Sequence, residues 1–254
     1  MSDFVPGLVS IITPAYRAAA FVGDAIRGAI AQTHREWEML IVDDCSPDDT
    51  AKQIASYAAT DARIRLIQAP RNGGPAVSRN LALERARGRF VAFCDADDYW
   101  LPEKLLSQLT FMTTHNIALS YTCYRRISED GRRTGRRIAV PEQLTYHGLL
   151  GNTAIATSSV ILDRRLVGDV RMSREFYDDF VLWLQILKSG HTAGGLRKDL
   201  LRYRVVRGSW SRNKSNSARM VWRTYREIER LSLPASCWYL TNYAIRGYLK
   251  YRRF

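Results

Sequence analysis

The N-terminal part of the chain alternates between short apolar runs and segments with helical periodicity. Runs rich in β-branched and other apolar residues predict strands at 8–13, 39–42, 64–68 and 90–94. Between them, apolar positions spaced along one face of a helix predict helices at 18–32, 50–59 and 75–87. Strands that alternate with helices indicate an α/β fold with a largely parallel sheet and right-handed crossovers.

The alternation weakens after residue 100. A helix is predicted at 101–115, and strand-like segments follow at 117–127, 136–140 and 157–162, with residues 128–132 as a hairpin turn. We therefore expect a mixed sheet here. A further apolar helix opens at Asp178-Asp179 and ends near Gly190, and from about residue 215 the pattern is helical, basic and aromatic, with a break at Pro234.

Polar groups follow three of the predicted strands. They are Thr13-Pro14-Ala15-Tyr16, Asp43-Asp44 and Asp95-Ala96-Asp97-Asp98. In parallel α/β sheets ligands bind outside the carboxyl ends of the strands, so these positions are candidates for a binding site. The DxD segment at 95–97 offers carboxylate oxygens to Mg²⁺ or Mn²⁺, although a solvated acidic turn or helix cap gives the same pattern. Asp43-Asp44 can bind a base N–H or ribose hydroxyls, or it can form Asx-turns that lead into the next helix.

Other candidates lie on turns and helix ends. Asn72-Gly73-Gly74 can bring backbone amides to a phosphate, or it can be a plain left-handed turn. Arg79 follows one turn into the next helix, where its spacing alone favours a solvated face. One of Asp178 and Asp179 can be a helix N-cap while the other serves as a general base, and the two roles are compatible.

Length and composition narrow the class of protein. The chain has 254 residues, of which 46% are hydrophobic, enough for a sizeable core. It has no apolar run of the roughly 18 residues that a spanning helix needs, and its start, MSDFVPGLVS, lacks a signal-peptide pattern. These features favour a cytosolic protein. The four cysteines are scattered without a CxxC pair, so neither a disulfide nor a zinc site is expected.

The charge of the chain is concentrated near its C-terminus. The formal net charge is +13, and residues 197–254 hold 15 Lys or Arg against 3 Asp or Glu. Such a segment can face nucleic acid, anionic lipid or substrate phosphates. Because residues 215–254 also interleave Trp and Tyr with Arg and Lys, we predict that this segment binds an anionic membrane surface. The alternative is an ordinary helical subdomain or an oligomer contact.

Six motifs in a fixed order resemble the family 2 glycosyltransferases of the GT-A fold, particularly bacterial enzymes of surface-polysaccharide synthesis. They are VSIITPAYR (9–17), QTHREWEMLIVDDCSPDDT (32–50), NGGPAVSRN (72–80), GRFVAFCDADDYW (88–100), DDFVLWLQI (178–186) and YRVVRGSWSRNK (203–214). The resemblance implies a Rossmann-like, mixed and mainly parallel sheet flanked by helices. It implies a catalytic domain over 1–214, with a nucleotide-binding half at 1–100 and an acceptor-binding half at 101–214, followed by the helical segment 215–254.

The resemblance also implies the residues that bind the donor, a nucleoside-diphosphate sugar of the UDP type. Pro14, Tyr16 and Asp44 would contact the nucleotide base, and Arg79 the base or a phosphate. Asp95 would approach the ribose. Asp97 would bind the metal, Mn²⁺ or Mg²⁺.

On the acceptor side, Asp179 matches the family's catalytic base, and Asp178 and Trp183 would lie at the acceptor site. The acceptor would be a glycan or lipid-linked glycan, used by an enzyme at the cytoplasmic face of a membrane. Transfer would be a single displacement that inverts the anomeric centre. The chain departs from the family pattern at Asp178, where Glu is usual, and at Cys45, where Gly is usual. The shorter side chain of Asp178 would reach less far toward sugar hydroxyls, and Cys45 would stiffen the turn after Asp44.

Two other classes of function compete with this interpretation. A nucleotidyltransferase would carry a Gly-rich basic signature near its N-terminus, which VSIITPAYRA lacks. A basic nucleic-acid-binding protein would explain the C-terminal charge and the arginines at 125, 126, 132, 133, 136 and 137. It leaves the strand-end carboxylates unexplained, so no nucleic-acid partner is expected.

Overall fold

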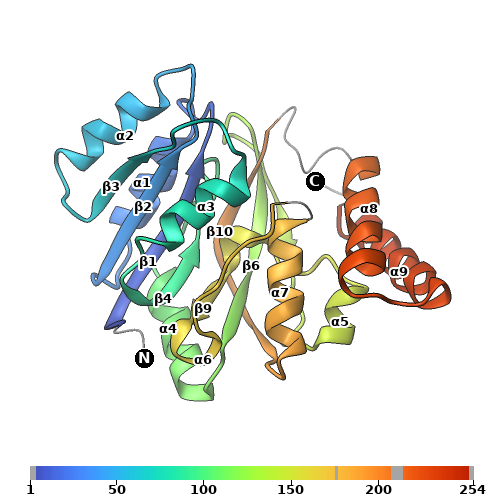
Figure 1. The fold of residues 1–254 in the computed structure, drawn as a ribbon. Coiled ribbons are helices and arrows are strands. Elements are labelled where there is room, and N and C mark those ends of the chain that lie inside the picture. The colour runs from blue at the N-terminus through green and yellow to red at the C-terminus, as the bar shows by residue number, and fades with distance from the viewer. Residues whose placement is uncertain (1–3, 175–176, 207–213, 252–254) are drawn as a thin grey trace.

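The computed structural model describes residues 4–174, 177–206 and 214–251. Its strands form one ten-stranded sheet. Helices lie against this sheet (Figure 1). The strands are β1 (Val5–Ala15), β2 (Trp37–Asp43), β3 (Ile64–Gln68), β4 (Gly88–Phe93), β5 (Tyr99–Trp100), β6 (Leu119–Ser128), β7 (Thr134–Ile138), β8 (Gln143–Leu144), β9 (Ile161–Asp163) and β10 (Ala193–Val205). The helices are α1 (Val22–Ile30), α2 (Thr50–Ala58), α3 (Pro75–Leu83), α4 (Lys104–His115), α5 (Tyr146–Leu150), α6 (Arg164–Val167), α7 (Asp178–Lys188), α8 (Lys214–Arg223) and α9 (Leu233–Tyr251).

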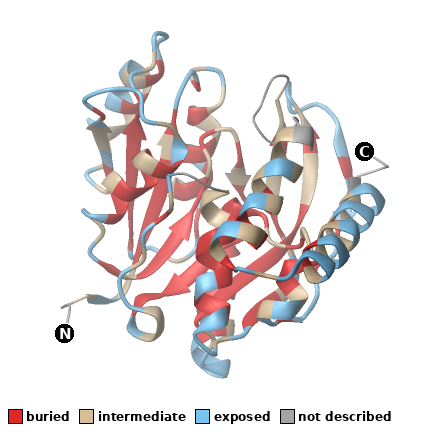
Figure 2. Cartoon of the chain, turned by 45° about the vertical axis from the view of Figure 1, so that its right-hand side comes forward, coloured by how far each residue is buried: buried red, intermediate tan, exposed pale blue. Residues whose placement is uncertain are grey.

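The parallel half of the sheet follows the sequence prediction. The order is β3-β2-β1-β4-β9-β6-β10-β5, and the first four strands run parallel. All seven residues of β2 are buried, as expected for a strand covered on both faces. Figure 2 shows the buried residues concentrated in the sheet and on the helix faces that cover it. The prediction of an α/β fold with a mainly parallel, mixed sheet is confirmed.

The mixed half arises where β9 runs antiparallel between β4 and β6. The hairpin predicted at 128–132 joins β6 to β7, which pair antiparallel. Strand β10 was not predicted, because its sequence AGGLRKDLLRYRV opens with two glycines and carries charges in its middle. The glycines are required by packing: a Cβ on Gly195 would lie 1.9 Å from the Pro141 carbonyl oxygen.

Three predicted boundaries differ from the structure. The first strand was expected to end before Pro14, yet β1 extends to Ala15 alongside β2. The helix predicted over 75–87 ends at Leu83, and the strand predicted over 90–94 begins earlier, at Gly88. Gly88 is needed because a Cβ there would lie 2.5 Å from the Leu8 carbonyl oxygen.

The C-terminal segment packs on the sheet domain through α5 and α7. A π-helical turn at Thr224–Ile228 follows α8, and the helical structure is interrupted before α9. Pro234 lies in the first turn of α9, where a backbone N–H is not needed for a hydrogen bond within the helix. Tyr225 is buried, and its hydroxyl donates to the Leu150 carbonyl oxygen. Within the described ranges, no helix is both long and apolar enough to cross a membrane.

Candidate active site

The acidic segment that follows β4 is partly withdrawn from water. Burial and the neighbouring Asp95 raise the pKa of Asp97 to about 6. Asp98 is 1% exposed, and burial raises its pKa well above the usual range. Its carboxylate accepts a hydrogen bond of 2.8 Å from the backbone N–H of Arg204. An anionic segment held in a poorly solvated position favours a bound cation.

Arg204, near the end of β10, fastens this acidic segment in place. Its buried guanidinium donates to the Asp97 carbonyl oxygen at 2.8 Å, to the Glu129 carbonyl oxygen at 2.9 Å and to a carboxylate oxygen of Asp24 at 2.6 Å. The segment is thereby tied to β10 and α1. Arg204 lies within the YRVVRGSWSRNK motif, but the sequence alone assigned no role to it.

Arg79, in α3, lies between the acidic segment and the start of α7. Its side chain is 7% exposed, so the prediction of a solvated helix face is wrong. One nitrogen lies 2.6 Å from Asp95 Oδ1 and another 2.8 Å from Asp178 Oδ2. These carboxylates together with Asp179 raise the pKa of Arg79 against the opposing effect of burial. The guanidinium group of Arg79 therefore links the acidic segment after β4 to the start of α7, which are the two halves of the predicted site.

The two aspartates at the start of α7 differ in their contacts. Tyr177 occupies the N-cap position, so the interpretation of either aspartate as N-cap is wrong. Asp179 accepts hydrogen bonds from the Thr157 hydroxyl and, at 2.6 Å, from the Phe180 N–H. Burial and the adjacent Asp178 raise the pKa of Asp179 to about 6. A carboxylate with a pKa near neutrality is well suited to general base catalysis.

On the nucleotide side, Asp44 is occupied by the protein itself. Its carboxylate accepts hydrogen bonds from the N–H groups of Gly73 at 2.9 Å and Gly74 at 2.8 Å, and Asn72 donates to its carbonyl oxygen at 3.0 Å. The two glycine amides that were expected to approach a phosphate are therefore engaged by Asp44. Each carboxylate oxygen of Asp44 accepts one of these bonds and keeps one lone pair, so the contact with the base stays a prediction.

Its neighbour Asp43 is better placed to meet a ligand. Among the described residues, Asp43 Oδ1 is a buried oxygen without a hydrogen-bond partner, and so are the hydroxyls of Thr13 and Ser78. These groups lie near the end of β1, at the end of β2 and in α3, which packs on both strands. Buried polar groups are usually paired, so the unpaired oxygens of Thr13 and Asp43, near the ends of the neighbouring strands β1 and β2, favour a polar ligand there.

Tyr16 and Cys45 lie on the loops that follow β1 and β2. The Tyr16 ring is 46% exposed, with Arg17 5.3 Å from its centroid, so it can stack on a base. Cys45 has a left-handed backbone with φ of 59°, which explains why glycine is usual here. A side chain in that region costs about 1 kcal/mol.

Trp183 is buried in the core. It is 2% exposed, and its ring lies 5.5 Å from the ring of Phe93 in an edge-to-face arrangement. The predicted contact of Trp183 with the acceptor stays a prediction, and little of this side chain reaches the surface in the structure. Its contact with Phe93 instead packs α7 against β4, the strand that carries the acidic segment.

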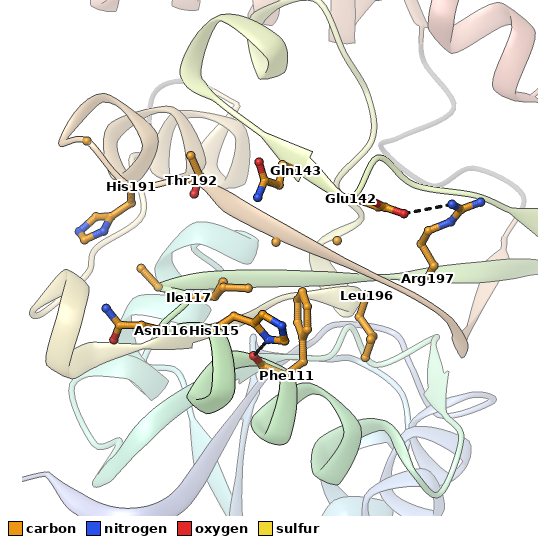
Figure 3. Close-up of a pocket in the computed structure, with 14 residues that line it drawn as sticks. Phe111, His115, Asn116, Ile117, Glu142, Gln143, His191, Thr192, Leu196 and Arg197 are labelled. Carbon is orange, nitrogen blue, oxygen red and sulfur yellow. Dashed lines mark hydrogen bonds and ion pairs between the residues drawn. The ribbon is translucent and has the colours of Figure 1, made fainter.

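A pocket of about 930 Å³ lies away from these residues (Figure 3). It is lined by His115, Gln143, His191 and the ion pair of Glu142 with Arg197, near the beginnings of β6 and β10. The carboxylates lie beyond the carboxyl end of β4, which runs in the same direction as β6, so the pocket is at the opposite edge of the sheet. It therefore takes no part in the candidate site.

Thr157 and Ser158 also reach the site without having been predicted. They belong to a short 3₁₀ turn, η1 (Thr157–Ser159), which the sequence analysis had included in a strand-like segment. A run of two serines and a threonine has no catalytic signature of its own, and only the structure shows its contacts with Asp95 and Asp179.

Comparisons with known proteins agree with this geometry. The model of the family described as Glycosyl transferase family 2 matches residues 10–171. The chain is 42% identical to the putative teichuronic acid biosynthesis glycosyltransferase TuaG of Bacillus subtilis, over 96% of this chain and 97% of the relative. It is 35% identical to UDP-Glc:alpha-D-GlcNAc-diphosphoundecaprenol beta-1,3-glucosyltransferase WfgD of Escherichia coli, over 99% and 96% of the two chains.

Solved structures show the same fold. The structure of S. aureus TarS 1-349 in complex with UDP-GlcNAc has a TM-score of 0.71 at 20% identity and covers 95% of this chain and 72% of its own. The Pyrobaculum calidifontis mannosyltransferase PcManGT, in complex with GDP-Man and Mn2+, has a TM-score of 0.70 at 17% identity, covering 94% and 73%. A nucleotidyltransferase or a non-enzymatic nucleic-acid-binding protein is thus set aside. The chain belongs to glycosyl transferase family 2 and is a glycosyltransferase.

Proposed function

We propose that this glycosyltransferase is metal-dependent and inverting, and that it moves a sugar from a UDP-sugar to a hydroxyl of a lipid-linked glycan in cell-surface polysaccharide synthesis. The observation that carries the proposal is the Arg79 bridge, which brings the acidic segment after β4 to the Asp178-Asp179 pair. The names of the relatives support the substrate class, since WfgD uses UDP-Glc and a diphosphoundecaprenol-linked sugar.

The donor side of the site suits a hard divalent cation. Asp97 and Asp95 offer carboxylate oxygens, which Mg²⁺ and Mn²⁺ prefer. No group of three or more potential ligand side chains occurs in the described part of the chain, so diphosphate oxygens and water would complete the coordination of an ion held by Asp97. When bound, the ion would stabilise the charge of the departing nucleoside diphosphate. Pro14, Tyr16 and Asp44 would contact the base and Asp95 the ribose, with Asp43 as an additional contact.

The acceptor side needs one base and no covalent nucleophile. We assign Asp179 to take the proton of the acceptor hydroxyl as that oxygen attacks the anomeric carbon, with inversion. Asp178, already paired with Arg79, is assigned to acceptor positioning. Arg79 is placed to compensate the negative charges of Asp95 and Asp178. The predicted contact of Arg79 with the base or a phosphate would require it to give up its contact with one of these two carboxylates.

A panel of nucleotide sugars tests this function. With Mn²⁺ or Mg²⁺ the purified protein is expected to hydrolyse one UDP-sugar slowly and to release UDP faster when a diphosphate-lipid-linked glycan is added. Chelation should remove both activities. Release of pyrophosphate from nucleoside triphosphates, or UDP release that is unaffected by chelation, would contradict the proposal.

Residues 215–254 are proposed to bring the enzyme to an anionic membrane, with α9 as the contact. The helix has two apolar sides: Tyr239, Leu240 and Tyr243 pack on the core. The exposed large side chains of the other side are Trp238 at 67%, Ile245 at 54%, Tyr248 at 66% and Leu249 at 46%. At 100° per residue, this outer side lies about opposite the packed one. Trp and Tyr beside aliphatic residues are typical of helices that lie at the headgroup level.

The charge and position of α9 suit the same partner. The helix contains no Asp or Glu, and Arg246 is exposed beside the apolar side. Lys250 donates to the Thr153 carbonyl oxygen, so the end of α9 lies on the loop that leads to Thr157 and the proposed base. Two basic residues of the predicted membrane-binding segment 215–254, Arg252 and Arg253, lie outside the described residues. A membrane on the outer side of α9 would thus lie near the acceptor side of the site.

Vesicle binding tests this contact. The double variant Trp238→Ser/Tyr248→Ser is expected to bind vesicles with anionic phosphatidylglycerol at least tenfold more weakly, because it removes the two most exposed aromatic rings. The control Val5→Ser/Leu106→Ser changes similarly exposed apolar residues elsewhere and should bind like the wild type. Equal binding by both variants, no wild-type binding at low salt, or a concentration-dependent dimer that α9 substitutions dissolve would contradict membrane docking.

A further inference from the structure

We infer that the η1 turn is a positioning element that holds the base Asp179 in register with the acidic segment that handles the donor. The inference rests on the proposed function, because it concerns the same site. Two adjacent residues of η1 make the connection: the Thr157 hydroxyl donates to Asp179 Oδ2, and the Ser158 hydroxyl accepts from the Asp95 N–H at 3.0 Å. The turn therefore touches both sides of the site within two residues.

The turn is itself rigidly mounted. Trp100 Nε1 donates to the Ser158 carbonyl oxygen at 2.8 Å, and Gln108 Nε2 donates to the Ser159 carbonyl oxygen at 3.0 Å. Lys104 donates to Gln108 Oε1 at 2.6 Å, which leaves the amide nitrogen facing the turn. These anchors come from β5 and α4 and are buried. Buried hydrogen-bond networks of this kind hold their members in one arrangement.

The contact of Thr157 also limits how Asp179 can act. Asp179 Oδ1 accepts from the Phe180 N–H and Oδ2 from Thr157, so each oxygen keeps one lone pair for an acceptor proton. Three groups face this carboxylate besides its own backbone: Asp178 from α7, Arg79 from α3 and the Thr157 hydroxyl from η1. The hydroxyl and Arg79 favour the ionised base, whereas Asp178 and burial oppose it.

Thr157→Val removes the hydroxyl at nearly constant size and tests the inference. We expect kcat to fall about 10- to 100-fold with the donor KM within about twofold, because the base is misoriented while the donor site stays intact. The acidic limb of the kcat–pH profile should move up by about one pH unit, since a donor to the carboxylate has been lost. Thr157→Ser keeps the hydroxyl, so its kcat should be within a few-fold of the wild-type value and the acidic limb of its kcat–pH profile should lie at the wild-type pH.

Ser158→Ala gives the complementary result. It leaves the Asp95 N–H without its partner, so the donor KM and the metal concentration for half-maximal rate should rise more than kcat falls. Direct titration with UDP and Mn²⁺ should show weaker binding by Ser158→Ala and unchanged binding by Thr157→Val. The two substitutions should be non-additive if η1 acts as one unit.

Thr122→Val is the matched control, because Thr122 is a fully buried threonine of β6 whose hydroxyl has no partner among the described residues. It should keep the wild-type kcat and pH profile. If Thr157→Val does not fold, Thr157→Ala replaces it in the same comparison with Thr157→Ser. A folded Thr157→Val or Thr157→Ala enzyme with wild-type kcat and pH profile overturns the inference, whereas a wild-type protein that transfers no sugar overturns the proposed function itself.

Discussion

Replacing Asp179 with asparagine is expected to lower kcat for sugar transfer by about a thousandfold, the usual scale for loss of a general base. UDP affinity should stay within about twofold of the wild type, because Asp179 lies at the start of α7 and not on the nucleotide side. Asparagine keeps an oxygen that accepts from Thr157 or Phe180, so the local structure should persist. Transfer kinetics and calorimetric UDP titration measure the two quantities separately.

The stability of this variant supplies a control with a definite sign. The pKa of Asp179 is raised to about 6 from an ordinary 3.8, so the folded protein binds this proton more tightly than the unfolded chain does. Ionisation of Asp179 therefore lowers the stability of the fold progressively as the pH rises from about 4 to about 6, and the full loss of stability is present above that pH. Asp179→Asn should thus melt no lower than the wild type at pH 7.5. A much lower melting temperature of Asp179→Asn, or turnover as fast as that of the wild type, would indicate that Asp179 has a structural role and not a catalytic one. The variant Asp178→Asn should show a milder loss of kcat than Asp179→Asn.

Removing the carboxylate of Asp97 is expected to abolish activity to the same degree as removing the metal. Asp97→Ala should lose at least a thousandfold in kcat/KM, because the charge of the leaving diphosphate would then lack its main compensation. Donor hydrolysis should likewise vanish with a chelator and return with Mn²⁺ or Mg²⁺ in the wild type alone. Steady-state UDP release measures both effects.

The matched control is Asp130→Ala, which removes an exposed carboxylate in the turn between β6 and β7. It should leave the metal response unchanged. If Asp97→Ala kept near-wild-type turnover, or if chelated enzyme did, the assignment of a metal to Asp97 would be wrong.

The parallel half of the fold could be predicted because most residues of its central strands are buried, as in β2 and β4. A run such as MLIV in β2 and the spacing of Val22, Ile26 and Ile30 in α1 each favour one type of element. Strand β10 escaped prediction because Arg197, Lys198 and Asp199 interrupt its apolar pattern. These charges sit at a shift of register between β10 and β6, so the irregularity lies in the pairing and not only in the sequence.

The site was predictable where it depends on strand ends. The acidic segment 95–98 and the pair Asp178-Asp179 became candidates because carboxylates follow a buried strand and open an apolar helix, and the family resemblance then assigned roles to Asp97 and Asp179. Arg79 was misjudged, since helix spacing says nothing of the carboxylates that α7 brings to it from 99 residues away. The sequence also does not show that the carboxylate of Asp44 accepts hydrogen bonds from Gly73 and Gly74, because these contacts depend on how the turn after β3 folds back on β2.

The stereochemistry of the product tests the central claim most directly. The enzyme, Mn²⁺, an α-linked UDP-sugar and a diphosphate-lipid-linked glycan acceptor are incubated, and the configuration of the new glycosidic bond is read from the anomeric proton by NMR. Single displacement with Asp179 as base predicts a β linkage. An α linkage would contradict the proposed mechanism. Retention of the anomeric configuration requires a second displacement or a front-face attack, whereas the proposed mechanism has one inverting displacement.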